Sequence, residues 1–257
     1  MHGLKVIYKK EVKSFFTSPT FYTIAFLATL ILSGLYMVRL SQFNAAAGNF
    51  MMQMGTPPRE LNIHYGVFLP HLSVFNLLLI MFVPALTMKL LSEEKKMRTF
   101  DLLLTSPVSS WEIVAGKLLA VMTAIFAMAF MVFLYPVVTA KATTVAWAPL
   151  IIAVLGLFLV GAVYAAMDLF ASSLTESALV AYVLAVVFNL SIWFIGTSVD
   201  VAENMNVRKV LEHISLNTHL SSLVEGTLRT NGLIFLFSLI FLFGFLAERV
   251  IESSRLK

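Results

Sequence analysis

Residues 84–119 read PALTMKLLSEEKKMRTFDLLLTSPVSSWEIVAGKLL, a charged segment that lies between two long apolar runs. The segment holds nine of the 32 charged side chains (18 basic and 14 acidic), yet the mostly apolar run FDLLL occupies residues 100–104 in its middle. A loop that is only solvated does not need such a run, because an uncovered apolar patch beside mixed charges is typical of a binding surface. The pattern therefore predicts a membrane protein that is contacted between two of its spans.

The composition supports a membrane location. Hydrophobic residues make up 59% of the 257 residues, charged residues make up 12%, and the mean hydropathy is +0.89. Soluble domains are about half apolar and a quarter charged, and a helix needs ~20 apolar residues to cross the hydrocarbon core. We therefore predict an all-α, polytopic protein, with one membrane domain of residues 1–257 and six transmembrane helices at residues 20–40, 66–91, 118–139, 148–171, 178–197 and 232–250.

The distribution of basic residues predicts the orientation. With the N-terminus inside, the inner segments carry twelve lysines and arginines and the outer segments carry six. Cytoplasmic loops carry the excess of basic residues, so both termini are expected in the cytoplasm. The loop around residues 172–177 has no basic residue and adds nothing to this assignment. Because topology accounts for the net charge of +4, we predict no nucleic-acid partner.

Several kinds of site and processing are disfavoured. The chain has no cysteine, which excludes disulfides, thiolate metal sites and a cysteine nucleophile. His64 and His71 lack a third metal ligand, so no metal site is predicted. The small residues 45–47 resemble a signal-peptide cleavage site, but the preceding apolar run exceeds the roughly 7–15 residues of a signal-peptide core. We expect the first span to be retained.

Residues 3–17 predict an amphipathic helix within an interfacial segment of residues 1–19. Its apolar face carries Leu4, Ile7, Tyr8, Val12 and Phe15, and the opposite face carries Lys5, Lys9, Lys10 and Lys13. This pattern is typical of a helix in the headgroup layer, with its apolar face toward the membrane and its lysines toward lipid phosphates. The alternative is a basic flank that only sets topology. Glu11 falls on the apolar face and does not fit the first interpretation.

The hydrophilic segment of residues 198–231 predicts two short amphipathic helices on the outer side. They lie against the outer membrane surface or dip into it, and Gly226 is placed to end the second one. The apolar stripes at helical spacing are Val207, Val210, Leu211 and Ile214 in the first helix, and Leu220, Leu223 and Val224 in the second.

The third span begins with a recognisable start signal. Ser109 and Glu112 form a capping box, in which the serine hydroxyl accepts from one free amide and the glutamate accepts from another. The helix is therefore expected to begin near Ser110, with Trp111 in its first turn, and to enter the bilayer only after Lys117.

Residues 99–105, directly upstream, predict a short helix roughly parallel to the membrane. Thr99 is its expected cap, Asp101 is favourably placed at its positive end, and Ser106 with Pro107 ends it. Three apolar side chains are expected to be exposed unless another protein covers them: Phe100, Leu103 and Leu104. The alternative is that they pack on this chain's own helices and that the charges only set topology.

The charged segment resembles the hallmark of one transporter family. The residues that carry the resemblance are Pro84, LSEEKK at 91–96, TFDLLLTSPV at 99–108, EIV at 112–114, Gly116, Lys117 and Ala120. They are similar to those of ABC-2-type permeases, and most similar to the subgroup of the gliding-motility permease and the permease for nitrous oxide reductase maturation. Residues 215–226 are also similar to that subgroup, so the resemblance covers essentially the whole chain.

This resemblance implies a transport subunit in the bacterial cytoplasmic (inner) membrane. Two permease chains, identical or related, would pair in the lipid over two copies of a cytoplasmic ATP-binding cassette subunit. The family's stretch between spans two and three docks into a groove of the ATPase, which gives residues 92–117 the role of a coupling segment. Arg98 departs from the family, where a glycine commonly precedes the threonine. The docking residues implied are Glu94, Thr99, Phe100, Asp101, Leu103, Leu104, Thr105, Ser106 and Pro107.

The chain is not expected to hydrolyse ATP itself. It contains no G-x-x-x-x-G-K-[ST] loop, because Gly116-Lys117-Leu118 lacks the earlier glycine and the hydroxyl. We therefore expect no catalytic residue, metal or cofactor in this chain, with ATP and Mg²⁺ on the partner ATPase.

Two other functional classes fit the sequence less well. A membrane-embedded enzyme needs converging polar groups, for which only Asp168, Asn189 and Ser191 are candidates. An ion-coupled secondary transporter would show inverted repeats or broken helices with buried charges, and no internal symmetry is found. The cargo stays open between a lipid, a peptide, a polysaccharide and mechanical work on a periplasmic protein.

Overall fold

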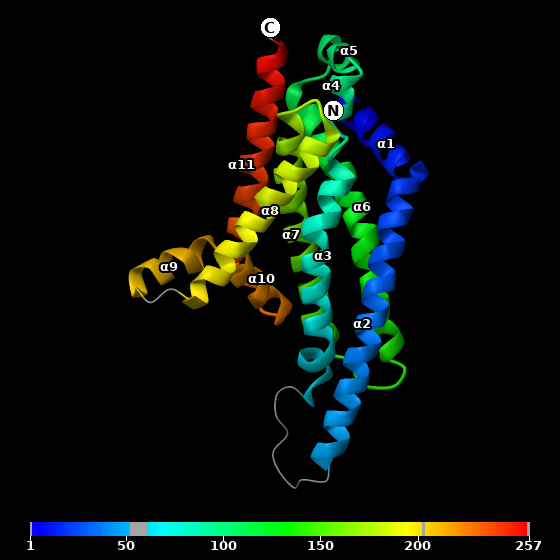
Figure 1. Cartoon of the computed structure of the whole chain (residues 1–257), viewed down its shortest axis with the longest axis vertical. Helices are drawn as coiled ribbons and strands as arrows, with labels where there is room; N and C mark the ends of the chain where they lie inside the picture. The colour runs from blue at the N-terminus through cyan, green and yellow to red at the C-terminus, as the bar shows by residue number, and fades with distance from the viewer. Residues whose placement is uncertain (1, 52–60, 202–203, 256–257) are drawn as a thin grey trace.

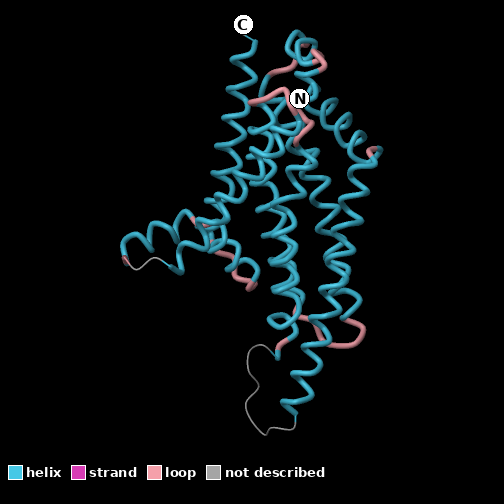
Figure 2. The backbone as a smooth tube through the Cα atoms, in the orientation of Figure 1, coloured by secondary structure: helices cyan, strands magenta, loops and turns pink. Residues whose placement is uncertain are grey.

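The computed structural model describes residues 2–51, 61–201 and 204–255, and every regular element in these ranges is helical (Figure 1). The all-α prediction is thereby confirmed. Figure 2 shows that the loops are confined to the ends of the helices. In chain order the elements are α1 (His2–Thr17), α2 (Pro19–Met51), the π-helix η2 (His64–Phe68), α3 (Leu69–Thr87), α4 (Ser92–Lys96), α5 (Phe100–Thr105), α6 (Ser110–Thr139), α7 (Trp147–Ser173), α8 (Ala178–Val201), α9 (Met205–Ile214), α10 (Leu216–Val224) and α11 (Thr230–Arg255).

Among the described residues, six helical stretches are long and apolar enough to cross a membrane, as the sequence predicts. They are α2, the stretch from η2 through α4, α6, α7, α8 and α11. The helix of the first span is longer than the predicted span of residues 20–40, because α2 continues to Met51. The alanines at residues 45–47 favour this extension, since alanine has the highest helix propensity. Residues 52–60 lie outside the described residues.

The helix α7 is the centre of the bundle. Its most apolar stretch is 67% buried, compared with 17% for that of α8, and α3, α6, α8, α10 and α11 all pack against it. A Cβ on Gly161 would lie 2.9 Å from Cγ2 of Ile125 in α6, so α6 and α7 approach each other closely at this glycine. The small residues of α7 around this contact are all buried: Gly161, Ala162, Ala165 and Ala166.

A set of polar contacts joins α3, α7 and α8 near the end of α3. Pro84 has no amide hydrogen to donate to the carbonyl oxygen of Ile80, four residues earlier. Nδ2 of Asn189 in α8 donates to that oxygen instead, at 3.4 Å. Oγ1 of Thr87 donates to Oδ2 of the buried Asp168, also at 3.4 Å. The side chain of Asp168 is therefore buried between helices.

Both termini lie at one end of the bundle, together with α1, α4 and α5 (Figure 1); we call this the terminal end. Away from that end, the two predicted amphipathic helices are present as α9 and α10. Gly226, with φ +85°, ends α10 as predicted, and a Cβ there would lie 2.5 Å from Cβ of Pro149 in the first turn of α7. Leu223 contacts Gly156, roughly 10 Å farther along α7. Thus α10 dips in between the spans.

Candidate functional site

The charged segment between α3 and α6 forms a two-helix excursion from the terminal end of the bundle. The helix α3 ends at Thr87, a short turn leads into α4, and residues 97–99 connect α4 to α5. Residues 106–109 then lead into α6. In Figure 1, α4 and α5 stand at the tip of the bundle, above the N-terminal helix α1.

The end of α7 holds the turn between α3 and α4. The amides of Leu91 and Ser92 both donate to Oγ of Ser172, each at 3.2 Å. That hydroxyl in turn donates to the carbonyl oxygen of Met88, at 3.1 Å. One buried serine thus satisfies two backbone donors and one acceptor that the break in the helix releases. The start of the coupling segment is therefore fixed to α7.

The side chain of Phe100 is buried, so the prediction that it is exposed is wrong. It is 5% exposed, and Nζ of Lys95 lies 5.3 Å from the centre of its ring. Lys95 also donates to the carbonyl oxygen of Ser173 at the end of α7. Residues at positions i, i+3 and i+4 share one helix face, and this face of α5 turns toward the bundle. Its other two members are half-buried: Leu103 and Leu104.

The outward face of α5 carries Leu102, which the sequence analysis does not single out. This side chain is 72% exposed. Among the predicted docking residues, Asp101, Thr105 and Pro107 are also exposed. Ser106 is half-buried, and its hydroxyl donates to the carbonyl oxygen of Leu103 at 2.6 Å, where α5 ends as predicted.

Thr99 does not cap α5 with its side chain, contrary to the prediction. Its backbone is helical, with φ −80° and ψ −13°, and its hydroxyl donates to the carbonyl oxygen of Glu94 at 3.3 Å. The preceding Arg98 has φ 56°, the one positive φ at a non-glycine residue among the described residues. The left-handed conformation costs an L-residue about 1–2 kcal/mol, and a glycine at this position would avoid this cost. The exposed Arg98 therefore stands at a strained junction between α4 and α5.

The capping box at the start of α6 is confirmed. The amide of Glu112 donates to Oγ of Ser109 at 3.2 Å, and the amide of Ser109 donates to Oε2 of Glu112 at 3.3 Å. The helix begins at Ser110, as predicted. Trp111 in its first turn stacks on Phe241 of α11, with the ring centres 5.9 Å apart. The exit of the coupling segment is thereby tied to α11.

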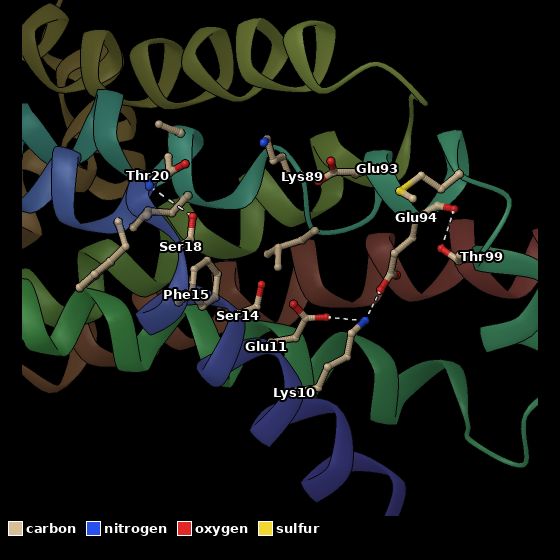
Figure 3. Close-up of a pocket in the computed structure, with 15 residues that line it drawn as sticks. Lys10, Glu11, Ser14, Phe15, Ser18, Thr20, Lys89, Glu93, Glu94 and Thr99 are labelled. Carbon is tan, nitrogen blue, oxygen red and sulfur yellow. Dashed lines mark hydrogen bonds and ion pairs between the residues drawn. The ribbon is translucent and has the colours of Figure 1, made fainter.

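A cluster of four charges joins α1, α4 and α6, and three of its members appear in Figure 3. The side chain of Lys117 is at the centre of the cluster and is 1% exposed. Its Nζ lies 2.8 Å from Oε1 of Glu11 and 3.0 Å from Oε1 of Glu94. The same Nζ donates to the carbonyl oxygen of Leu90 at 2.6 Å. Lys10 completes the cluster from the rim, with Nζ 2.8 Å from Oε1 of Glu94 and 3.3 Å from Oε1 of Glu11. Burial opposes the charge of Lys10, but the hydrogen bond to Glu94 leaves its pKa raised.

We call these four residues, Lys10, Glu11, Glu94 and Lys117, the Glu11–Lys117 cluster. The sequence alone does not predict this cluster. Lys117 is buried inside the protein, where two carboxylates compensate its charge, and is not exposed to water. One signal could have revealed it. Glu11 interrupts the apolar face of its helix, and a carboxylate on a buried face requires a cation nearby.

The apolar face of α1 packs on protein, so the prediction that it faces the membrane is also wrong. Ile7 and Phe15 are buried, and a Cβ on Gly116 of α6 would lie 2.9 Å from Cγ2 of Ile7. The hydroxyl of Tyr8 is hydrogen-bonded to Oγ1 of Thr123 in α6, at 3.0 Å. The four lysines are exposed: Lys5, Lys9, Lys10 and Lys13.

Comparison with protein families identifies the chain. The family model described as ABC-2 family transporter protein matches residues 5–240, which include the coupling segment and all or part of every span. The chain belongs to the ABC-2 transporter family. It is a multi-pass membrane permease, and the family supports a permease component of an ABC transporter. No curated protein matches this permease.

Proposed function

We propose that this permease couples ATP hydrolysis by a separate cytoplasmic ATPase to export or to mechanical work across the membrane, and that the ATPase docks on α5. The observation that carries the proposal is Leu102, 72% exposed on a short helix whose other apolar side chains face inward. A single exposed leucine is common on protein surfaces. Here it lies close to the strained, exposed Arg98, and strained residues cluster at functional sites.

The anchoring of the coupling segment supports transmission of force from the ATPase to the spans. Ser172 ties its start to α7, the Glu11–Lys117 cluster ties α4 to α1 and α6, and Trp111 ties its exit to α11. A displacement of α5 would therefore move several spans together instead of bending a loose loop. Packed helices respond to such a displacement as rigid bodies.

The proposed assembly places the terminal end in the cytoplasm of a bacterial cell. The twelve-to-six excess of basic residues supports this orientation in the inner membrane. Two ATPase subunits would serve this chain and a second permease, identical or related, and ATP with Mg²⁺ would bind to the ATPase. We place the permease in the subgroup of the gliding-motility and nitrous oxide reductase maturation permeases on the residues of its coupling segment.

Replacing Leu102 by aspartate tests the docking. We expect Leu102→Asp to weaken binding of the ATPase by at least tenfold, in the range of an interface hot spot of ~2 kcal/mol, and to abolish stimulation of ATP hydrolysis. Leu228→Asp is the matched control, because Leu228 is 58% exposed in the loop before α11. Leu103→Asp and Leu104→Asp should have the same effect but also disturb α5 itself. An intact, coupled complex with Leu102→Asp would overturn the proposal.

A further inference from the structure

A cavity of about 330 Å³ lies at the terminal end, between α1, the start of α2, the end of α3 and α4 (Figure 3). Part of its wall is apolar and comes mainly from the ends of two spans, with Phe21 from α2 and Ala85 and Leu86 from α3. The wall becomes polar away from the spans. Its charged and hydroxyl-bearing residues are Lys10, Glu11, Ser14, Ser18, Thr20, Lys89, Glu93, Glu94 and Thr99.

The charges around the cavity sum to zero. The wall carries two positive charges, on Lys10 and Lys89, and three negative charges, so its net charge is −1. The negative charges belong to Glu11, Glu93 and Glu94. Lys117 contacts two of these carboxylates and brings the sum to zero. An anionic headgroup prefers a cluster of lysines, so this balanced wall suits a ligand that carries both signs.

Two charged groups on the wall are available to a ligand, whereas the carboxylate of Glu94 is already paired with Lys10 and Lys117. Lys89 and Glu93 are exposed, and neither forms an ion pair with another residue in the part of the chain that the structure describes. One carboxylate and one ammonium thus line a space that is an order of magnitude larger than one water molecule of ~30 Å³.

We propose that this cavity binds the headgroup of a zwitterionic phospholipid with a phosphate and a primary ammonium, as in phosphatidylethanolamine. The ammonium donates to Glu93, and the phosphate accepts from Lys89 and from the hydroxyl of Ser14. The acyl chains follow the apolar wall into the bilayer. A primary ammonium has three N–H donors, whereas the quaternary ammonium of phosphatidylcholine has none, so the site discriminates between these two lipids. The proposal depends on the membrane location and not on the ATPase.

Lipid retention tests the proposal. The full chain, purified with the subunits that accompany it, is exchanged into micelles that contain equal amounts of phosphatidylethanolamine and phosphatidylcholine with identical acyl chains. Bound lipid is then measured by native mass spectrometry. We expect phosphatidylethanolamine to be retained roughly tenfold over phosphatidylcholine, the effect of a hydrogen bond to a charged group. Glu93→Gln should reduce this ratio to near one, and Lys89→Gln should lower retention of both lipids.

Lys96→Gln is the matched control, because Lys96 is exposed on α4 but does not line the cavity. Its retention ratio should equal that of the unaltered chain. Equal retention of both lipids by the unaltered chain would overturn the proposal. So would an unchanged ratio in Glu93→Gln, which would locate the bound lipid on another surface. Retention of phosphatidylethanolamine only after the ATPase is removed would show that the ATPase fills the cavity, and would also overturn it.

Discussion

Replacing Lys117 by methionine would leave two carboxylates buried without their central cation. Methionine keeps the unbranched apolar stem, so the change removes the charge with little loss of packing. Breaking a buried ion pair costs about 3–5 kcal/mol. Lys10 still reaches both carboxylates, at 2.8 Å and 3.3 Å, although its side chain is 61% exposed. We therefore expect the lower end of this range, about 3 kcal/mol of stability.

The assay is equilibrium unfolding in mixed micelles, with Lys117→Met, Glu11→Gln and the double variant compared in one cycle. Because the two residues are in contact, the double variant should lose less stability than the sum of the single variants, by about 0.5–3 kcal/mol. Lys96→Met, at an exposed position of α4, serves as the control and should stay within about 0.5 kcal/mol of the unaltered chain. A loss below about 1 kcal/mol for Lys117→Met, or strict additivity, would refute the reasoning.

Three further substitutions test local features in the same assay. Arg98→Gly should raise stability by about 1 kcal/mol, because glycine adopts φ 56° without strain; a loss would mean that the arginine side chain stabilises the junction. Ser109→Ala should lower stability by about 1 kcal/mol, because it removes the hydroxyl that caps α6, and no change would show that water replaces the cap. Gly226→Ala should cost more than about 1 kcal/mol, since φ is +85° and Cα of Pro149 lies 2.7 Å from the new Cβ; tolerance would show that α10 can shift.

The features that follow from local sequence are predictable here. The six spans depend on runs of apolar residues, and the start of α6 depends on Ser109 and Glu112, three positions apart. The end of α10 depends on one glycine. Each of these signals lies within a few residues of the helix or helix end that it determines. These features can therefore be predicted from the sequence alone.

The features that depend on distant partners are not predictable in this way. Glu11 and Lys117 are separated by 106 positions, and neither residue alone shows that the other will neutralise it. The buried ring of Phe100 lies under Lys95, which binds the end of α7 through a contact that spans 78 positions. The helical spacing of α5 correctly places Phe100, Leu103 and Leu104 on one face. The sequence does not show that this face turns toward the bundle, because that depends on tertiary contacts. Hence Leu102, not Phe100, presents the apolar surface.

Crosslinking from position 102 tests the central claim most directly. The chain has no cysteine, so Leu102→Cys gives a single site for a photoactivatable thiol reagent in native membranes. The docking account predicts that the label reacts from the cytoplasmic side and crosslinks to an ATP-binding cassette ATPase. Leu228→Cys, in the loop before α11, should react only from the opposite side and capture no ATPase. Labelling of position 102 from the periplasmic side, or crosslinks from it only to this chain, would contradict the account.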